Sequence, residues 1–251
     1  MIAVLSPAKS LDYDSPLPSE TATRPRFEAE ASMLAAAAAN LGKKKLGTLM
    51  HISEALATLN DQRFKGFLDQ PERPAIHAFD GDVYTGFEVK TLNEAALDFA
   101  QDHVRILSGL YGLLRPLDAM RPYRLEMGTR WAPRKKALTE WWGTRVADQL
   151  AQDLDAEGSG VVLNLASQEY WAAVDGMLPA GVRVVDVDFR DPGPDGPRFV
   201  SFHAKKARGM LARWLVEHRV SGVEAMQDFD SAGYRFDPAE SEANRWRFTR
   251  T

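Results

Sequence analysis

The sequence predicts an α+β fold, a single domain over residues 1–251 in which helices flank a mixed β-sheet. Short apolar runs typical of buried strands are mixed with longer segments of helical periodicity, without the regular alternation of a doubly wound dinucleotide-binding fold. Of the 251 residues, 45% are hydrophobic and 26% are charged, which is an ordinary globular composition. No Gly/Ser linker or low-complexity segment separates two halves, so we expect one domain.

The first part of the chain is predicted to contain one strand, two helices and a strand with a turn. Residues 2–5 form an apolar run that Ser6-Pro7 ends, which indicates a buried strand. The Ala-rich residues 27–41 predict a helix, and residues 45–60 predict a second one because their leucines fall on one face. Residues 75–87 indicate a strand and turn, punctuated by glycines.

The remaining elements follow from capping signals, periodicity and turn residues. Thr91-Leu92-Asn93-Glu94 is a capping-box pattern that predicts a helix over residues 92–107. Periodicity predicts helices over 138–154 and 205–218 and a short helix over 167–174. Apolar runs and turn residues predict strands at 161–165, 182–189 and 198–202, the last two on either side of a Pro/Gly-rich turn, and a closing hairpin in the aromatic tail.

The composition excludes several kinds of chemistry. With no cysteine, the chain has no disulfide, cannot cycle a thiolate against peroxide and cannot hold an iron–sulfur cluster through thiolates. Its five histidines are scattered without ligand spacing, so we expect no metal site and no cofactor. The N-terminus lacks a basic leader and no apolar run could cross a bilayer, which favours a cytoplasmic location without membrane attachment.

Positive charge is concentrated in two segments of an acidic chain. The formal net charge is −4. Residues 105–136 hold eight basic residues against two acidic ones, and residues 198–219 hold six against one. These segments carry +6 and +5, so the rest of the chain carries −15. Such a distribution is compatible with an anionic partner in spite of the overall charge.

The first candidate site is the turn Leu107-Ser108-Gly109-Leu110-Tyr111-Gly112, between two segments predicted to be helical. Glycines permit a tight turn with exposed amide groups, and a helix N-terminus favours a phosphate. The turn therefore resembles the hairpin of a helix-hairpin-helix DNA-binding motif. A plain helix–helix turn with core apolar side chains is the alternative. The predicted DNA-binding residues are Gly109, Leu110, Tyr111, Gly112, Arg115, Arg121 and Arg124.

The second candidate site is a pocket for an anion, formed by loops at strand ends. Ser6 and Lys9 suit an anion, whereas Asp82 and Glu169 suit acid–base work or cation orientation. Basic residues in the first turn of the 205–218 helix oppose its dipole, so an anion is expected near them. Taken one by one, these residues are better explained by capping, turn formation and solvation than by a functional role. The full predicted set is Ser6, Lys9, Asp82, Tyr84, Thr85, Glu126, Asn164, Ser167, Glu169, Tyr170, Lys205, Lys206 and Arg208.

Seven blocks in one order resemble the YaaA family of peroxide stress proteins. They are Ser6-Pro7-Ala8-Lys9, Gly81-Asp82-Val83-Tyr84-Thr85-Gly86, the turn at residues 107–112, Arg115-Pro116-Leu117-Asp118, residues 122–128, Asn164-Leu165-Ala166-Ser167 and residues 204–209. The resemblance covers nearly the whole chain. It implies a cytosolic protein made under hydrogen peroxide stress that limits damage to DNA and protein by lowering available intracellular iron.

Two hypotheses about molecular function follow. In the first, the hairpin and its arginines bind duplex DNA through phosphates, with weak sequence preference. In the second, the chain is an enzyme that acts on a phosphate- or carboxylate-bearing metabolite. Its cleft would be lined by Ser6, Lys9, Asp82, Glu126, Glu169 and Lys206. An exposed hairpin favours DNA binding, whereas convergence in a deep pocket favours the small anionic ligand.

Overall fold

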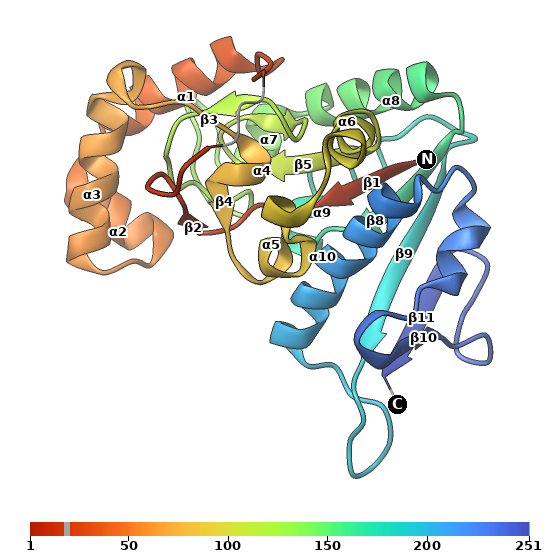
Figure 1. Ribbon diagram of the computed structural model, residues 1–251. Coiled ribbons are helices and arrows are strands. Elements are labelled where there is room, and N and C mark those ends of the chain that lie inside the picture. The colour runs from red at the N-terminus through yellow and green to blue at the C-terminus, as the bar shows by residue number, and fades with distance from the viewer. Residues whose placement is uncertain (18–20, 251) are drawn as a thin grey trace.

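The computed structural model describes residues 1–17 and 21–250 and has a seven-stranded sheet at its centre (Figure 1). The sheet strands are β1 (Ile2–Leu5), β5 (Val104–Ser108), β6 (Gly112–Leu114), β8 (Val161–Leu165), β9 (Arg183–Arg190), β10 (Tyr234–Phe236) and β11 (Arg245–Arg250). Their order is β10-β11-β9-β8-β1-β5-β6. Two short pairs lie outside it: β2 (Ser10–Leu11) with β4 (Phe79–Asp80), and β3 (Arg73–Pro74) with β7 (Ala119–Met120).

The sheet is mixed. Strands β11, β9, β8, β1 and β5 run parallel, and the edge strands β10 and β6 are antiparallel to their neighbours. Central parallel strands are covered on both faces, which explains why every residue of β1 is buried. The predicted α+β fold with a mixed sheet flanked by helices is confirmed.

Ten α-helices occur in the described residues. They are α1 (Glu28–Ala39), α2 (Gly42–Met50), α3 (Glu54–Lys65), α4 (Ala75–Ala78), α5 (Asp82–Phe87), α6 (Glu94–His103), α7 (Leu138–Trp142), α8 (Arg145–Glu157), α9 (Gln168–Trp171) and α10 (Ser201–His218). Figure 1 shows α1, α2 and α3 together at the end of the molecule opposite β10 and β11. Helices α6 and α10 pack on the sheet against β1, and α8 packs near β6.

Two long predicted helices are each interrupted. The predicted helix over residues 45–60 is wrong as one element, because His51 adopts a left-handed conformation (φ 51°) that ends α2. Ser53 then begins α3, its hydroxyl accepting a hydrogen bond from the Leu56 amide at 3.4 Å. The predicted helix over 138–154 is likewise divided into α7 and α8, at Gly143 (φ 55°).

Other predictions differ from the structure in their ends or in their type. The Asn93 side chain caps α6 at Glu94, but the helix ends at His103 and the chain continues as β5. Residues 75–87 are mostly helical, as α4 and α5, with only the two-residue β4 as strand. Residues 198–202 form no strand; a single bridge joins Asp191 to Arg198 before α10 begins. The strands predicted at 2–5, 161–165 and 182–189 and the closing hairpin are confirmed.

Candidate functional site

The turn at residues 109–112 is a buried β-hairpin, so the predicted helix-hairpin-helix element at this position is wrong. Strands β5 and β6 pair antiparallel on either side of it, with Ser108 opposite Gly112. Leu110 is 0% and Tyr111 is 1% exposed. The apolar run after α6 satisfies its backbone by pairing in the sheet, and the turn packs into the core.

The two glycines of this turn serve packing. A Cβ on Gly109 would lie 2.1 Å from the carbonyl oxygen of Leu125. Gly112 has φ 66°, and a Cβ there would lie 2.9 Å from the Trp142 ring. Both positions therefore need glycine because of internal contacts and backbone conformation, without any role for a phosphate.

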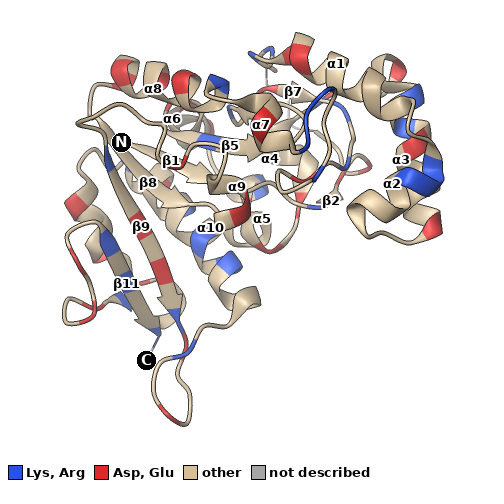
Figure 2. Cartoon of the chain, turned by 180° about the vertical axis from the view of Figure 1, so that it is seen from behind, with Lys and Arg blue, Asp and Glu red and all other residues tan. Residues whose placement is uncertain are grey.

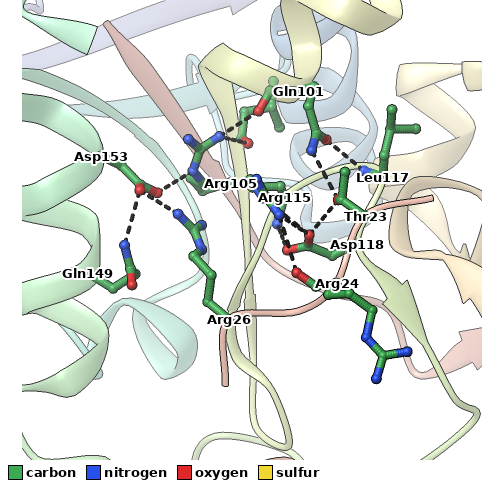
Figure 3. Close-up of polar contacts among 11 residues, drawn as sticks. Thr23, Arg24, Arg26, Gln101, Arg105, Arg115, Leu117, Asp118, Gln149 and Asp153 are labelled. Carbon is green, nitrogen blue, oxygen red and sulfur yellow. Dashed lines mark hydrogen bonds and ion pairs between the residues drawn. The ribbon is translucent and has the colours of Figure 1, made fainter. Parts of the chain in front are cut away.

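Arg115 is held by the buried Asp118, as Figure 3 shows. Its backbone amide and its guanidinium donate to the Asp118 carboxylate, which is 0% exposed and also accepts from Thr23 Oγ1 at 2.7 Å. A neighbouring network joins Arg105 to Asp153 at 2.5 Å. Much of the charge of the 105–136 segment is thus neutralised internally.

The other two predicted DNA-binding arginines are also paired. Arg121 forms an ion pair with Glu72, in which Nη2 lies 2.7 Å from Oε1, and it lies over the Phe67 ring, 5.8 Å from its centroid. Arg124 Nε donates to Glu126 at 2.9 Å. Both side chains are about five-sixths buried, at 15% and 16% exposure. The seven residues predicted to bind DNA do not form one exposed surface.

Several residues of the predicted anion pocket do lie together, because the carboxyl ends of β1 and β8 bring their loops to one place. These strands are neighbours, with Leu5 opposite Leu165. Ser6 Oγ accepts a hydrogen bond from the Ser167 amide at 2.8 Å, and it donates to Ser167 Oγ at 3.4 Å. A cavity of about 400 Å³ opens here. The predicted residues that line it are Ser6, Lys9, Asp82, Ser167, Glu169, Tyr170, Lys205 and Arg208.

The remaining predicted pocket residues lie elsewhere, so the six-residue cleft is not one cavity. Lys206 and Thr85 line a separate hollow, and Glu126 lines an adjoining groove. Asn164 lines a second cavity and donates from Nδ2 to Asp186 at 2.7 Å. Tyr84 is buried, and its hydroxyl donates to the Ser6 carbonyl at 3.1 Å. Burial raises the pKa of the Tyr84 and Tyr170 hydroxyls well above their usual range, so both stay protonated.

A close crossing of α5 and α10 sets the wall of this cavity. A Cβ on Gly209 would lie 1.8 Å from the Val83 carbonyl oxygen, and one on Gly86 would lie 2.0 Å from the Lys206 carbonyl oxygen. Only glycine at both positions lets the two backbones approach so closely. The crossing holds Lys205 beside Asp82, with Nζ 4.0 Å from the carboxylate.

The sequence analysis missed a helical hairpin formed by α2 and α3. The two helices pack on each other, joined by a turn at residues 51–53. The available signal was Ser53-Glu54, a helix-start pattern inside the leucine-bearing face that we took for one helix. The end of α2 and its turn face residues 124–130 across a groove of about 510 Å³. It is lined by Lys9, Thr48, Leu49, Met50, His51, Arg124, Glu126, Gly128, Thr129, Arg130 and Glu169.

Exposed cations lie on the two segments that border this groove, and one of them, Arg130, lines it. Figure 2 shows basic segments on the α2–α3 pair and on the loop before α7 in the same view. Among the described residues, six of these cations have no ion-pair partner. They are Lys44, Lys45, Arg130, Arg134, Lys135 and Lys136, and all six are exposed.

Neither a metal-binding cluster nor a membrane-spanning helix occurs among the described residues. No group of three or more His, Asp or Glu side chains there could hold a metal ion. None of the helices in that part of the chain is long and apolar enough to cross a membrane.

Comparison with known proteins shows the family. A family model described as "Peroxide stress protein YaaA" matches residues 1–240. A UPF0246 protein of Rhizorhabdus wittichii is 59% identical over 252 residues, covering 100% of both chains. UPF0246 proteins of Bordetella petrii and Cellvibrio japonicus are 46% and 44% identical over 255 residues, covering 100% of this chain and 99% and 98% of theirs. The chain therefore belongs to the YaaA peroxide stress protein family.

Proposed function

We propose that the protein binds duplex DNA in the groove between the α2–α3 hairpin and residues 124–136, with weak sequence preference, as part of a response to peroxide stress. The observation that carries this proposal is the set of six exposed cations, without ion-pair partners in the described chain, on the two segments that border the groove; of these, Arg130 lines the groove itself. It replaces the buried 109–112 turn as the place of binding.

The chemistry of these cations favours phosphates. Lysines are point charges on flexible stems, and exposed arginines can donate to two phosphate oxygens at once. Such contacts hold the DNA backbone and carry no base information, which accounts for weak sequence preference. Binding of this kind releases counterions, so its affinity falls steeply with salt.

The cations beside the groove differ from the earlier arginines of the 105–136 segment in what their charges already contact. Arg115 and Arg121 are held by Asp118 and Glu72. Lys44, Lys45 and Arg130 have no such partner in the described chain and remain available to a ligand. The acidic side chains in the groove are Glu126 and Glu169, and Glu126 is engaged by Arg124.

Fluorescence anisotropy of labelled duplexes over a salt series tests this function. We expect Lys44→Ala/Lys45→Ala to reduce the magnitude of the slope of log K against log salt by roughly 1.8, about 0.9 for each lost phosphate contact. The reduction should be the same for unrelated duplex sequences. A matched control, Arg198→Ala/Arg235→Ala, removes two exposed arginines far from the groove and should leave the slope unchanged.

Two outcomes would overturn the proposal. One is absence of duplex binding by the wild-type protein at low salt. The other is a slope that falls in the arginine control and stays at the wild-type value in the lysine variant.

The cellular part of the proposal is that the protein limits oxidative damage by lowering available iron, through its binding to DNA. In peroxide-treated cells that lack the chromosomal gene, electron paramagnetic resonance of chelatable iron should fall when the wild-type protein is supplied. It should not fall with Lys44→Ala/Lys45→Ala. Equal restoration by both proteins would show that iron is controlled independently of the groove.

A further inference from the structure

Arg208 is a partly buried cation without an ion-pair partner among the described residues. It lies on α10, and its Nε is completely buried with no hydrogen-bond acceptor. Its guanidinium makes no hydrogen bond or ion pair with another residue of the described chain. Desolvation by burial lowers its pKa, and the nearby charge of Asp188 raises it. That carboxylate is already engaged by Arg190 at 2.7 Å and Arg247 at 3.5 Å.

A buried guanidinium N–H such as that of Arg208 Nε is unfavourable unless an acceptor is supplied. Its planar fork suits the paired oxygens of a phosphate or a carboxylate. Since no described protein group supplies those oxygens, a bound anion is the natural acceptor.

Arg208 stands between two cavities that have room for such a ligand. On one side is the cavity of about 400 Å³, where Lys205, Lys9, Ser6 and Ser167 lie. On the other side is a cavity of about 550 Å³, which Trp171, Asn164 and Asp186 help to line. Both volumes are within the usual range for small-molecule sites, and the first lies outside the carboxyl ends of two adjacent parallel strands.

The charges around the first cavity restrict the ligand further. Lys9, Lys205 and Arg208 are balanced by Asp80, Asp82 and Glu169. A ligand that is anionic throughout would meet the three carboxylates. A ligand with one phosphate end and hydroxyl groups elsewhere satisfies both sets, since its phosphate meets the cations and its hydroxyls donate to the carboxylates.

We propose that the cavity around Arg208 binds a phosphate monoester that carries hydroxyl groups. Such a group occurs in a free nucleotide or sugar phosphate, whereas the 5′-phosphorylated end of a DNA strand shares the phosphate monoester but lacks the free hydroxyl groups. Lys9 and Glu169 line both this cavity and the duplex-binding groove, so an end held in the groove lies next to it. The site does not depend on the proposed duplex binding, which uses internal phosphates and other cations.

Isothermal titration calorimetry of the full chain tests the proposal in two arms. The first compares adenosine 5′-monophosphate with adenosine, a probe whose base can stack on Trp171. The second compares a duplex that carries 5′-phosphates with the same duplex carrying 5′-hydroxyls. We expect the phosphate to improve affinity at least about tenfold in one arm or both, as a charge-assisted contact would. Dependence in the first arm alone identifies a small molecule, and dependence in the second alone identifies a nucleic-acid end.

Variants place the binding at Arg208. Arg208→Met should abolish the phosphate-dependent gain while keeping or raising the melting temperature, because it removes a partly buried charge whose Nε has no acceptor in the described chain. Lys206→Met, on the same helix but in another hollow, should bind like the wild type. Lys205→Met removes an exposed cation of the cavity, and it should weaken phosphate binding even if Arg208→Met fails to fold. The proposal is overturned if phosphate gives no gain in either arm, or if Arg208→Met, or Lys205→Met in its place, retains the full gain.

Discussion

Gly209→Ala should destabilise the protein by separating α5 from α10. The added Cβ would lie 1.8 Å from the Val83 carbonyl oxygen and 2.8 Å from the Phe87 amide nitrogen. Both are backbone atoms that no side-chain rotation can move. The helices would have to separate by roughly 1.5 Å to restore ordinary contact.

Overpacking a core usually costs about 1 to 3 kcal/mol, and a backbone obstacle favours the upper end. In a chain of this size, about 3 kcal/mol lowers the melting temperature by roughly 6 to 12 °C. Circular dichroism melting measures this shift. Because α10 carries Arg208, the variant should also lose affinity for adenosine 5′-monophosphate if that ligand occupies the cavity.

Gly222→Ala is the matched control. Gly222 has φ −103°, and no atom lies within 4 Å of a Cβ placed there. Its free energy of unfolding should change by less than about 1 kcal/mol, with a small gain expected from reduced freedom of the unfolded chain. A Gly209→Ala protein that melts with the wild type, or a control that is equally destabilised, would refute the packing argument.

Two further predictions concern ion pairs. Asp153→Ala should lower the free energy of unfolding by about 3 to 5 kcal/mol in urea titrations, because it leaves Arg105 buried without its carboxylate; a loss below about 1 kcal/mol would contradict this. Desolvation opposes ionisation of Glu157, but hydrogen bonds from the N-terminal ammonium and Ser159 outweigh it and hold its pKa below the ordinary 4.5. The stabilisation from these hydrogen bonds is therefore present above pH 4.5 and is lost as pH falls through the lowered pKa. Glu157→Gln should make the free energy of unfolding depend less on pH in that acid range. An unchanged pH profile would contradict the assignment.

The sequence predicted the elements whose signal is local. The strands at residues 2–5 and 161–165 are short, mainly apolar runs next to turn residues. The capping pattern at residues 91–94 predicts the start of α6 to within two residues, although the cap is Asn93 and not Thr91. Residues 104–107 were assigned to the preceding helix because a short apolar run fits a buried helix end as well as a strand. The break at His51 was missed because the apolar face continues on both sides of it.

The candidate sites show the same difference between features with a local sequence signal and features that depend on the folded chain. The pocket at Ser6 and Ser167 was predictable because strand ends of a parallel pair meet at one edge of a sheet. The arginines predicted to bind DNA were expected to be free for phosphates, because their ion-pair partners are not visible from local sequence. Arg121 pairs with Glu72, 49 positions away, and this contact exists only after folding. An isolated count of basic residues therefore overstates the charge available to a partner.

Hydrogen–deuterium exchange of the protein with and without an unlabelled duplex tests the proposed groove most directly. Backbone amides lose protection where the chain opens and gain it where a ligand covers them. Duplex binding should slow exchange at residues 42–56 and 124–136 and leave β10 and the 191–198 loop unchanged. Protection confined to β10, that loop or the 104–118 segment, with none on the α2–α3 hairpin, would contradict the account.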